Sequence, residues 1–309
     1  MAQHLLTVAD LGVKSVEHCL QLAARCKRSP NIGSRALAGK TLALIFQKPS
    51  IRTRVSFQVA IAALGGSTVY LAPEDIQLDK REPVKDVART LSRYVEGVIV
   101  RTFTHQQVEE FARFSTVPVI NGLSDLHHPC QALADVLTVQ ERIPKLKGVT
   151  IAYIGDGNNV LHSLAQVCGF LGINLRVATP KRYKPNDTIW QQAASEAATR
   201  GAEFLLTEDP AEAVKGADAL YTDVWTSMGQ EREQDERLKA FKGFQINHQL
   251  LSLAKPRCLV MHCLPAHRGE EITEDVLEGP QSVVFDQAEN RLHAQKALLL
   301  MLAGGSAYS

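Results

Sequence analysis

Hydrophobic positions along this chain fall into short runs that alternate with segments of helical spacing. The runs are bounded by polar residues or by Gly and Pro, which is typical of strands buried on both faces. They are residues 41–46, 68–71, 97–100, 117–120, 149–154, 175–178, 219–222, 259–262 and 283–285. This alternation predicts an α/β protein with parallel sheets that are covered by helices.

The number of runs is enough for two sheets. A boundary is expected at residues 143–148, where a long helix from about Cys130 ends in a short Pro/Gly connection before a new strand. We therefore expect one domain over residues 1–144 and a second over 145–289, with the last helix, about 290–309, packing back on the first. Each domain is expected to be doubly wound, with a central parallel sheet flanked by helices and the active site in the interdomain cleft.

Charge and composition narrow the class of partner. The 309 residues are 45% hydrophobic, and 34 Lys and Arg face 33 Asp and Glu, which gives no support to nucleic-acid or membrane-surface binding. Small molecules or other subunits are the expected partners. No membrane-length apolar run or secretion signal is visible, so a cytoplasmic protein is expected. Cysteines without paired spacing fit reduced thiols; they are Cys19, Cys26, Cys130, Cys168, Cys258 and Cys263.

A basic segment, residues 47–54, lies between the run 41–46 and a helical pattern over residues 55–64. Unpaired amides and the positive dipole end of a helix start favour an anion, and Ser50, Arg52, Thr53 and Arg54 add donors there. The segment is thus a candidate phosphate site. The alternative is an ordinary capped helix with two solvated arginines.

Glycine-rich and histidine-rich turns follow two further strands. The turn Gly-Asp-Gly-Asn-Asn at residues 155–159 lacks the third glycine of a dinucleotide site, so nicotinamide binding is disfavoured, and Asn159 is either a ligand or part of a tight turn. His128 and Gln131 can address one small polar ligand, or belong to a structural turn. A zinc site ranks lower because its candidates lack paired spacing; they are His127, His128, Cys130, His262 and Cys263.

Two more strand ends carry reactive groups. Cys263, in the segment His-Cys-Leu-Pro-Ala-His, is either a thiol that exchanges a proton with an amine or a buried inert cysteine. Asp223, in Asp-Val-Trp-Thr-Ser-Met-Gly, is either a partner for the ammonium group of an amino acid or a helix cap. Because the carboxyl ends of parallel strands meet at one edge, these signals together favour one active site.

These motifs carry a family resemblance over nearly the whole chain. Ser-x-Arg-Thr-Arg, His-Pro-x-Gln and His-Cys-Leu-Pro-Ala, in this order, resemble the aspartate/ornithine carbamoyltransferase family, and Asp-x-x-x-Ser-Met-Gly resembles its ornithine branch. The resemblance implies a carbamoyl-phosphate domain and an amino-acid domain, usually in a homotrimer with sites between subunits. It implies transfer of a carbamoyl group from carbamoyl phosphate to the δ-amine of L-ornithine, giving L-citrulline, without a metal or organic cofactor.

The resemblance also assigns roles to individual residues. For carbamoyl phosphate it implies Ser50, Ile51, Arg52, Thr53, Gln77 from a neighbouring subunit, Arg101, His128, Gln131, Cys263, Leu264 and Arg291. For ornithine it implies Asn159, Asp223, Ser227 and Met228. Arg101, His128 and Cys263 are the expected catalytic residues.

Ile51 departs from the family pattern, which commonly has Thr there, so its side chain is expected to weaken the grip on phosphate modestly. An acceptor without an α-carboxylate, such as putrescine, leaves the clamp at residues 223–229 without its partner. Aspartate is disfavoured as the acceptor, because the segment His-Cys-Leu-Pro at residues 262–265 lacks the basic residue that its second carboxylate would need. A catalytically silent carbamoyltransferase-like binding subunit and a dinucleotide-dependent oxidoreductase remain as alternatives of other classes.

Overall fold

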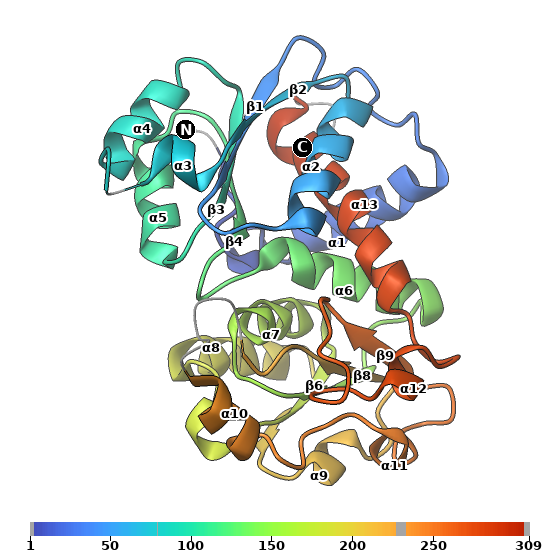
Figure 1. Ribbon diagram of the computed structural model, residues 1–309. Coiled ribbons are helices and arrows are strands. Elements are labelled where there is room, and N and C mark those ends of the chain that lie inside the picture. Colours follow the sequence, from blue (N-terminus) through green and yellow to red (C-terminus); the bar gives the residue numbers. More distant parts are fainter. Residues whose placement is uncertain (1–2, 79, 227–232, 306–309) are drawn as a thin grey trace. The chain divides into compact units, whose positions relative to one another are not determined.

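The computed structural model describes residues 3–78, 80–226 and 233–305 (Figure 1). By its internal contacts the chain divides into two compact units. Unit 1 comprises Met1–Leu137 and Glu289–Ser309, and unit 2 comprises Thr138–Ala288. Each unit has one parallel sheet with helices packed against it, so the predicted fold class of two parallel-sheet α/β domains is confirmed.

Unit 1 is built around a four-stranded sheet. Its elements are η1 (Val8–Asp10), α1 (Gly12–Arg28), β1 (Thr41–Phe46), α2 (Ile51–Ala63), β2 (Ser67–Leu71), α3 (Pro73–Ile76), α4 (Val84–Leu91), β3 (Gly97–Arg101), α5 (His105–Phe114), β4 (Val119–Leu123), most of α6 (Pro129–Arg142) and most of α13 (Val284–Ala303).

The strand order of unit 1 is β2-β1-β3-β4, and every neighbouring pair is parallel. The order reverses between β1 and β3, which is the point where ligands bind in open parallel sheets. Phe46 at the end of β1 pairs with Arg101 at the end of β3, and the Gln47 amide donates to the Arg101 carbonyl over 2.8 Å. The segment 47–54 and Arg101 therefore leave the sheet side by side.

Unit 2 is built around a five-stranded sheet. Its elements are β5 (Thr150–Ile154), α7 (Asn159–Leu171), β6 (Asn174–Ala178), η2 (Lys181–Tyr183), α8 (Asp187–Thr199), β7 (Phe204–Thr207), α9 (Pro210–Val214), β8 (Ala219–Thr222), α10 (Gln234–Ala240), α11 (His248–Leu251), β9 (Leu259–His262) and α12 (Glu274–Leu277).

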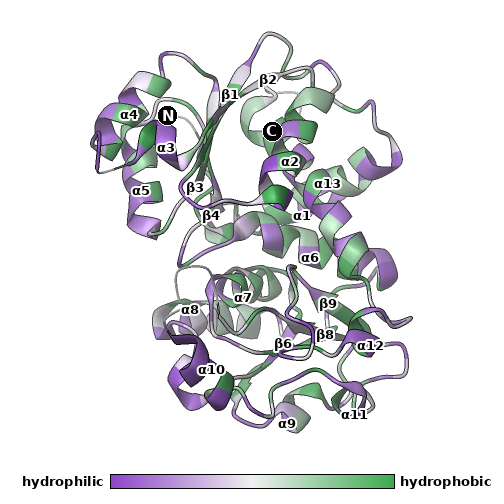
Figure 2. Cartoon of the chain, viewed as in Figure 1, coloured by the Kyte–Doolittle hydropathy of each residue, from purple (hydrophilic) through white to green (hydrophobic). Residues whose placement is uncertain are grey.

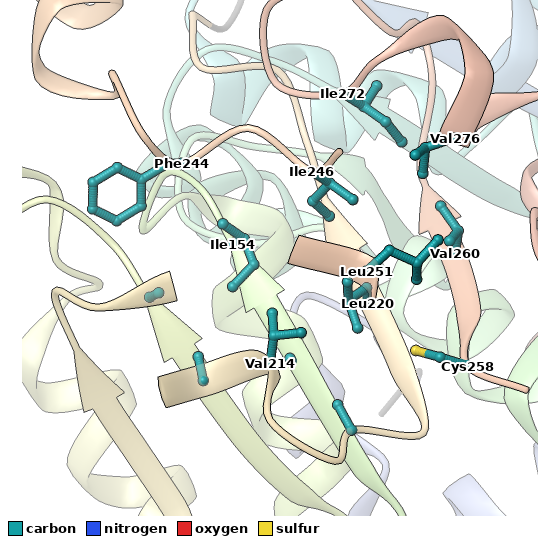
Figure 3. Packing of buried hydrophobic residues seen from close by; sticks show 14 of the residues in the cluster. Ile154, Val214, Leu220, Phe244, Ile246, Leu251, Cys258, Val260, Ile272 and Val276 are labelled. Atoms are coloured by element: carbon teal, nitrogen blue, oxygen red, sulfur yellow. The ribbon is translucent and has the colours of Figure 1, made fainter. Parts of the chain in front are cut away.

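The strand order of unit 2 is β7-β6-β5-β8-β9, again parallel throughout, with the reversal between β5 and β8. Thr222 at the end of β8 pairs with His262 at the end of β9. Residues from these strands form the core of the unit, where Ile154, Leu220 and Val260 pack into one buried cluster (Figure 3). This packing fixes the carboxyl ends of β5, β8 and β9 along one edge.

Two expectations about strands were wrong. Residues 283–285 are not a strand: Val283 donates its amide to the Val260 carbonyl over 2.9 Å, but α13 begins at the next residue. A short apolar run fits a buried helix start as well as a strand. The second error is an omission: β7, a short edge strand of half-buried residues, was not predicted.

Figure 2 shows α10 as a mostly hydrophilic helix, whereas α7, which is buried along most of its length, is largely hydrophobic. Within the described ranges, no helix is both long and apolar enough to cross a lipid bilayer.

Candidate active site

The segment 47–54 starts α2 earlier than the sequence pattern predicted. The helix begins at Ile51, and the Ser50 hydroxyl accepts a hydrogen bond from the Thr53 amide over 3.3 Å. Ser50 is therefore a helix cap, and its hydroxyl can still donate its own hydrogen to an anion. Capping uses the Thr53 amide, while the other amides of the first turn have no partner within the helix and lie at the positive end of its dipole.

A buried hydrogen-bond chain joins three of the predicted carbamoyl-phosphate residues in unit 1. The Arg291 guanidinium donates to Gln131 Oε1 over 2.5 Å and to Thr53 Oγ1 over 3.3 Å. Gln131 Nε2 in turn donates to Asp135 Oδ1 over 2.7 Å. All four side chains are buried. The chain fixes which end of the Gln131 amide faces Arg291, so its oxygen lies on the cationic side.

His128 is buried within the same cationic surroundings. Burial lowers its pKa well below the usual value, and the nearby charges of Arg291 and Arg101 lower it further. The imidazole is therefore neutral at physiological pH and can donate one ring N–H to a carbonyl oxygen. Arg101, at the end of β3, is itself 7% exposed, which places a second strong donor inside the unit.

Gln77 lies at a different place in unit 1. It ends α3 with a left-handed backbone, φ 36°, and lines an open pocket of about 390 Å³ together with Gln47, Lys80 and Phe103. Among the described residues that line this pocket, none is Thr53, Gln131 or Arg291. The structure thus brings Thr53, Gln131 and Arg291 together and places Gln77 apart from them.

In unit 2, the carboxylate of Asp223 connects the ends of three strands. Its Oδ1 lies 2.9 Å from Cys263 Sγ, and its Oδ2 accepts from Asn158 Nδ2 over 2.8 Å. Asp223 follows β8, Cys263 follows β9, and Asn158 follows β5. Asp223 is thus not a helix cap, and Cys263 is only partly buried. A carboxylate beside a thiol can attract an ammonium group and exchange protons with it.

Sequence reasoning selected Asn159 and missed Asn158. Asn158 is the N-cap of α7: its Oδ1 accepts from the amides of Val160 and Leu161, over 3.0 and 3.2 Å. Its amide nitrogen is therefore the group left to bond Asp223. The signal was available, because Asn is a preferred N-cap residue directly before an apolar helical run. Asn159 is the first residue of α7.

The glycine-rich turn of unit 2 has a structural explanation that does not involve a dinucleotide. A Cβ on Gly157 would lie 2.3 Å from the Pro185 nitrogen and 2.4 Å from the Lys184 carbonyl carbon. The close approach that this glycine permits is therefore to the chain's own backbone. This packing does not support the oxidoreductase alternative.

A buried ion pair next to this turn was not predicted. Arg237 donates to Asp156 Oδ2 over 3.0 Å and to the Trp225 carbonyl over 2.9 Å. Burial raises the pKa of Asp156 to about 6, with Arg237 opposing the rise and Asp223 adding to it. Unit 2 therefore holds two carboxyl groups near one another at the edge of its sheet.

Asp223, His262 and Cys263 offer ligand atoms within 4.8 Å of one another, but two of the predicted zinc ligands, Cys130 and His262, are already engaged in other bonds. Burial raises the pKa of Cys130 to about 11, so its thiol keeps its proton and lies 3.6 Å from the Asn121 carbonyl. His262 uses both ring nitrogens, one toward the Leu264 amide over 2.9 Å and one toward Glu271 over 3.0 Å. A metal needs a ring nitrogen that is not already bonded.

Leu264, directly after Cys263, has a left-handed backbone with φ 57°. Ser227 and Met228 lie outside the described residues.

The chain matches known proteins over nearly its full length. Residues 3–141 match the aspartate/ornithine carbamoyltransferase carbamoyl-P binding domain, and residues 147–302 match the Asp/Orn binding domain of the same family. Over 303 residues it is 53% identical to the anabolic ornithine carbamoyltransferase of Pyrococcus furiosus, covering 97% of this chain and 96% of that protein. It is 51% identical to the ornithine carbamoyltransferase of Methanoculleus marisnigri, covering 99% of each.

Solved structures agree with these matches. The ornithine carbamoyltransferase from Pyrococcus furiosus aligns with a TM-score of 0.95 at 52% identity, covering 99% of this chain and 98% of that chain. The anabolic enzyme from Campylobacter jejuni aligns with a TM-score of 0.92 at 40% identity, covering 97% and 98%. Both domain matches and the whole-chain identities lead to one conclusion: the chain is a member of the aspartate/ornithine carbamoyltransferase family.

Proposed function

We propose that this protein is an ornithine carbamoyltransferase, which transfers the carbamoyl group of carbamoyl phosphate to the δ-amine of L-ornithine and releases L-citrulline and phosphate. The observation that carries the choice of acceptor is the contact of 2.9 Å between Asp223 and Cys263. Both amino acids carry the α-ammonium that a buried carboxylate attracts, so the discrimination comes from repulsion of the second carboxylate of aspartate, where ornithine carries an amine. The names of the relatives, at about half identity over the whole chain, support the same acceptor.

In the proposed reaction, unit 1 binds carbamoyl phosphate. The backbone amides at the start of α2, that of Ile51 included, and the side chains of Ser50, Arg52 and Thr53 hold the phosphate. Arg101 and His128 donate to the carbonyl oxygen, where negative charge develops as the amine attacks, and such donors supply much of the rate enhancement. Because His128 is neutral, it donates without adding a charge that the site must otherwise compensate.

Gln131 and Arg291 complete this side of the reaction. Gln131 Oε1 already accepts from Arg291, and its second lone pair is available to the carbamoyl NH₂. The amine nitrogen then bonds to the carbonyl carbon, the bond from this carbon to the bridging oxygen breaks, and phosphate leaves with the electron pair. The departing phosphate takes the remaining surplus proton of the nitrogen, which leaves the citrulline nitrogen neutral.

Unit 2 binds ornithine and prepares its amine. Asp223 pairs with the α-ammonium, and Asn159, Ser227 and Met228 complete the clamp. The δ-amine of ornithine is protonated at neutral pH, because such amines titrate near 10 as lysine does. Cys263, with Asp223 behind it, takes part in removing that proton, and the Leu264 backbone lies beside the amine.

We further propose a cytoplasmic homotrimer that acts in arginine biosynthesis, with Gln77 reaching the phosphate of a neighbouring subunit. Exposed apolar side chains support the assembly: Ile51, Val55 and Val59 lie along one face of α2, and Val69 lies on the edge strand β2. Water contact with such a stripe is unfavourable, and a second chain would remove it. Light scattering across a dilution series tests the assembly.

Product formation tests the activity. Carbamoyl phosphate is offered with ornithine, putrescine or aspartate in parallel, and the carbamoylated product is quantified. Citrulline is expected as the main product. A higher kcat/KM for putrescine than for ornithine would favour a putrescine carbamoyltransferase. If none of the three acceptors gives a product, the protein is better explained as a catalytically silent binding subunit.

A further inference from the structure

One buried pair, His262 and Glu271, holds the loop that carries Cys263. Both side chains are fully buried in unit 2, with His262 at the end of β9 and Glu271 beyond the loop. Neither residue has a role in the proposed function. The two side chains accept hydrogen bonds from backbone amides of the loop.

The hydrogen bonds of His262 fix the position of its proton. The Leu264 amide donates to His262 Nδ1 over 2.9 Å. A backbone N–H is always a donor, so Nδ1 carries no proton and the neutral ring carries it on Nε2. Nε2 lies 3.0 Å from Glu271 Oε1 and therefore donates to that oxygen.

Glu271 is itself fixed to the core of unit 2. Its carbonyl accepts from the Ile246 amide over 2.9 Å, and the next residue, Ile272, lies in the buried cluster with Ile246 and Val276 (Figure 3). Glu271 Oε1 also accepts from the His267 amide over 2.6 Å. One carboxyl group thus anchors the loop at two points, at His267 directly and at Leu264 through His262.

We propose that His262 and Glu271 are positioning residues for the acceptor amine. The pair holds the Leu264 amide, and with it the left-handed backbone at Leu264, a conformation that leucine rarely adopts. That backbone sets the Cys263 thiol at 2.9 Å from Asp223 and directs the Leu264 carbonyl toward the acceptor amine. The proposal rests on the proposed function, because it names the group that is positioned as the amine of ornithine.

Two substitutions of His262 separate positioning from mere stability. His262→Asn keeps an acceptor near Nδ1 for the Leu264 amide but does not reach Glu271. His262→Gln reaches Glu271 with an amide N–H but leaves the Leu264 amide without its acceptor. Misplacement of about 1 Å costs about 100-fold in rate, so we expect kcat with ornithine to fall about 100-fold in His262→Gln and far less in His262→Asn.

Stability should follow the opposite order. His262→Asn removes a donor from the buried Glu271 carboxyl group, so its melting temperature should fall more than that of His262→Gln. His248→Gln is the matched control, since His248 is exposed and pairs with the exposed Asp275 over 2.9 Å in the same unit; it should change neither quantity. Equal kcat in the two His262 variants, or kcat that follows melting temperature, would overturn the proposal.

Alkylation of Cys263 by iodoacetamide gives a readout that does not need catalysis. The other five cysteines are buried, so reaction with the native protein reports the Cys263 thiol. We expect faster alkylation in His262→Gln, where the thiol moves from the Asp223 carboxylate, and a rate close to the original in His262→Asn. An unchanged rate in His262→Gln would overturn the proposal even if the protein makes citrulline. If it makes none, the proposed function fails, and alkylation still decides the positioning.

Discussion

The two units have the same kind of parallel sheet, and they present opposite charges at its carboxyl edge. Unit 1 buries the guanidinium groups of Arg101 and Arg291 with one carboxylate, Asp135, whereas unit 2 buries the carboxyl groups of Asp156 and Asp223 with one guanidinium, Arg237. In the proposed reaction one substrate is a phosphate anion and the other carries an ammonium group. The topology therefore supplies the place for a ligand, and a few buried side chains decide its charge.

The same difference appears in how each unit treats a titratable group. Burial and two arginines in unit 1 hold His128 neutral by lowering its pKa. In unit 2, burial outweighs Arg237 and raises the pKa of Asp156 to about 6. One unit thus keeps a base uncharged at neutral pH, and the other keeps an acid close to its titration point.

Replacing the cation of unit 1 should have the largest effect. Arg101→Met removes a buried donor to the carbonyl oxygen, and loss of one such donor costs about 100-fold to 1000-fold in kcat. Steady-state kinetics measure it. Arg113→Met, an exposed arginine of the same unit on α5, should retain full activity. Full activity in Arg101→Met, with the fold intact by circular dichroism, would contradict the cationic role of unit 1.

Neutralising the anion of unit 2 should act on the other substrate. Asp223→Asn keeps the shape but removes the charge that pairs with the α-ammonium, and a charged hydrogen bond is worth about 1.5 to 3 kcal/mol, or roughly 10-fold to 100-fold in KM for ornithine. KM for carbamoyl phosphate should stay constant. Asp218→Asn, at the other end of β8, is the control. Equal changes in the KM for ornithine and the KM for carbamoyl phosphate would contradict the assignment of one substrate to each unit by charge.

Strand positions were accessible from sequence because buried parallel strands are continuous apolar runs. The runs at 41–46, 219–222 and 259–262 coincide with β1, β8 and β9. A run and the polar turn behind it are both local features, so Asp223 and Cys263 were found together with their strands. The sequence predicted that both residues lie at the same edge of a sheet, but not that Asp223 and Cys263 contact each other.

Other features depend on packing that a single segment does not encode. The link from Arg237 to Asp156 spans 81 positions in the chain, and that from Arg291 to Gln131 spans 160. The run at 283–285 was misread because apolar residues start a buried helix and a strand alike. The role of Asn158 was missed for a different reason: its capping bond was predictable, but its partner Asp223 is not adjacent in sequence.

The acid of unit 2 should make the stability of that unit depend on pH. The pKa of Asp156 is about 6 in the fold and 3.8 as the reference, so the fold binds more protons than the unfolded chain between these values. Its stabilisation is present at low pH and is lost as pH rises through about 6. Acidification from pH 7 to 5 should therefore add about 1 kcal/mol, and Asp156→Asn should abolish this gain.

Tryptophan fluorescence during urea unfolding reads this effect, because Trp190 and Trp225 both lie in unit 2. His128 in unit 1 acts in the opposite direction: its lowered pKa means that the unfolded state gains a proton first, so unit 1 loses stability as pH falls below about 6.5. Asp235→Asn, exposed on α10, should leave the pH dependence unchanged. If acidification stabilises Asp156→Asn as much as the original protein, the pH dependence of stability comes from a group other than Asp156.

The smallest effect is expected at Ile51, where the family pattern leads us to expect Thr. Its side chain is 74% exposed at the first position of α2, in line with Val55 and Val59. Ile51→Thr adds a hydroxyl that can bond phosphate, worth about 1 kcal/mol or roughly fivefold in KM for carbamoyl phosphate. It also removes apolar surface from the stripe that we assign to the subunit contact.

Val59→Thr separates these two consequences, because it changes the same stripe two turns away from the helix start. Both variants should have a weaker subunit contact, so light scattering should show that they dissociate at a higher protein concentration than the original protein. Only Ile51→Thr should lower KM for carbamoyl phosphate. A lower KM in both would mean that assembly, through the neighbouring subunit, controls phosphate binding. No change in KM in Ile51→Thr would mean that the backbone amides of α2 already hold the phosphate, and that isoleucine at this position serves only the contact between chains.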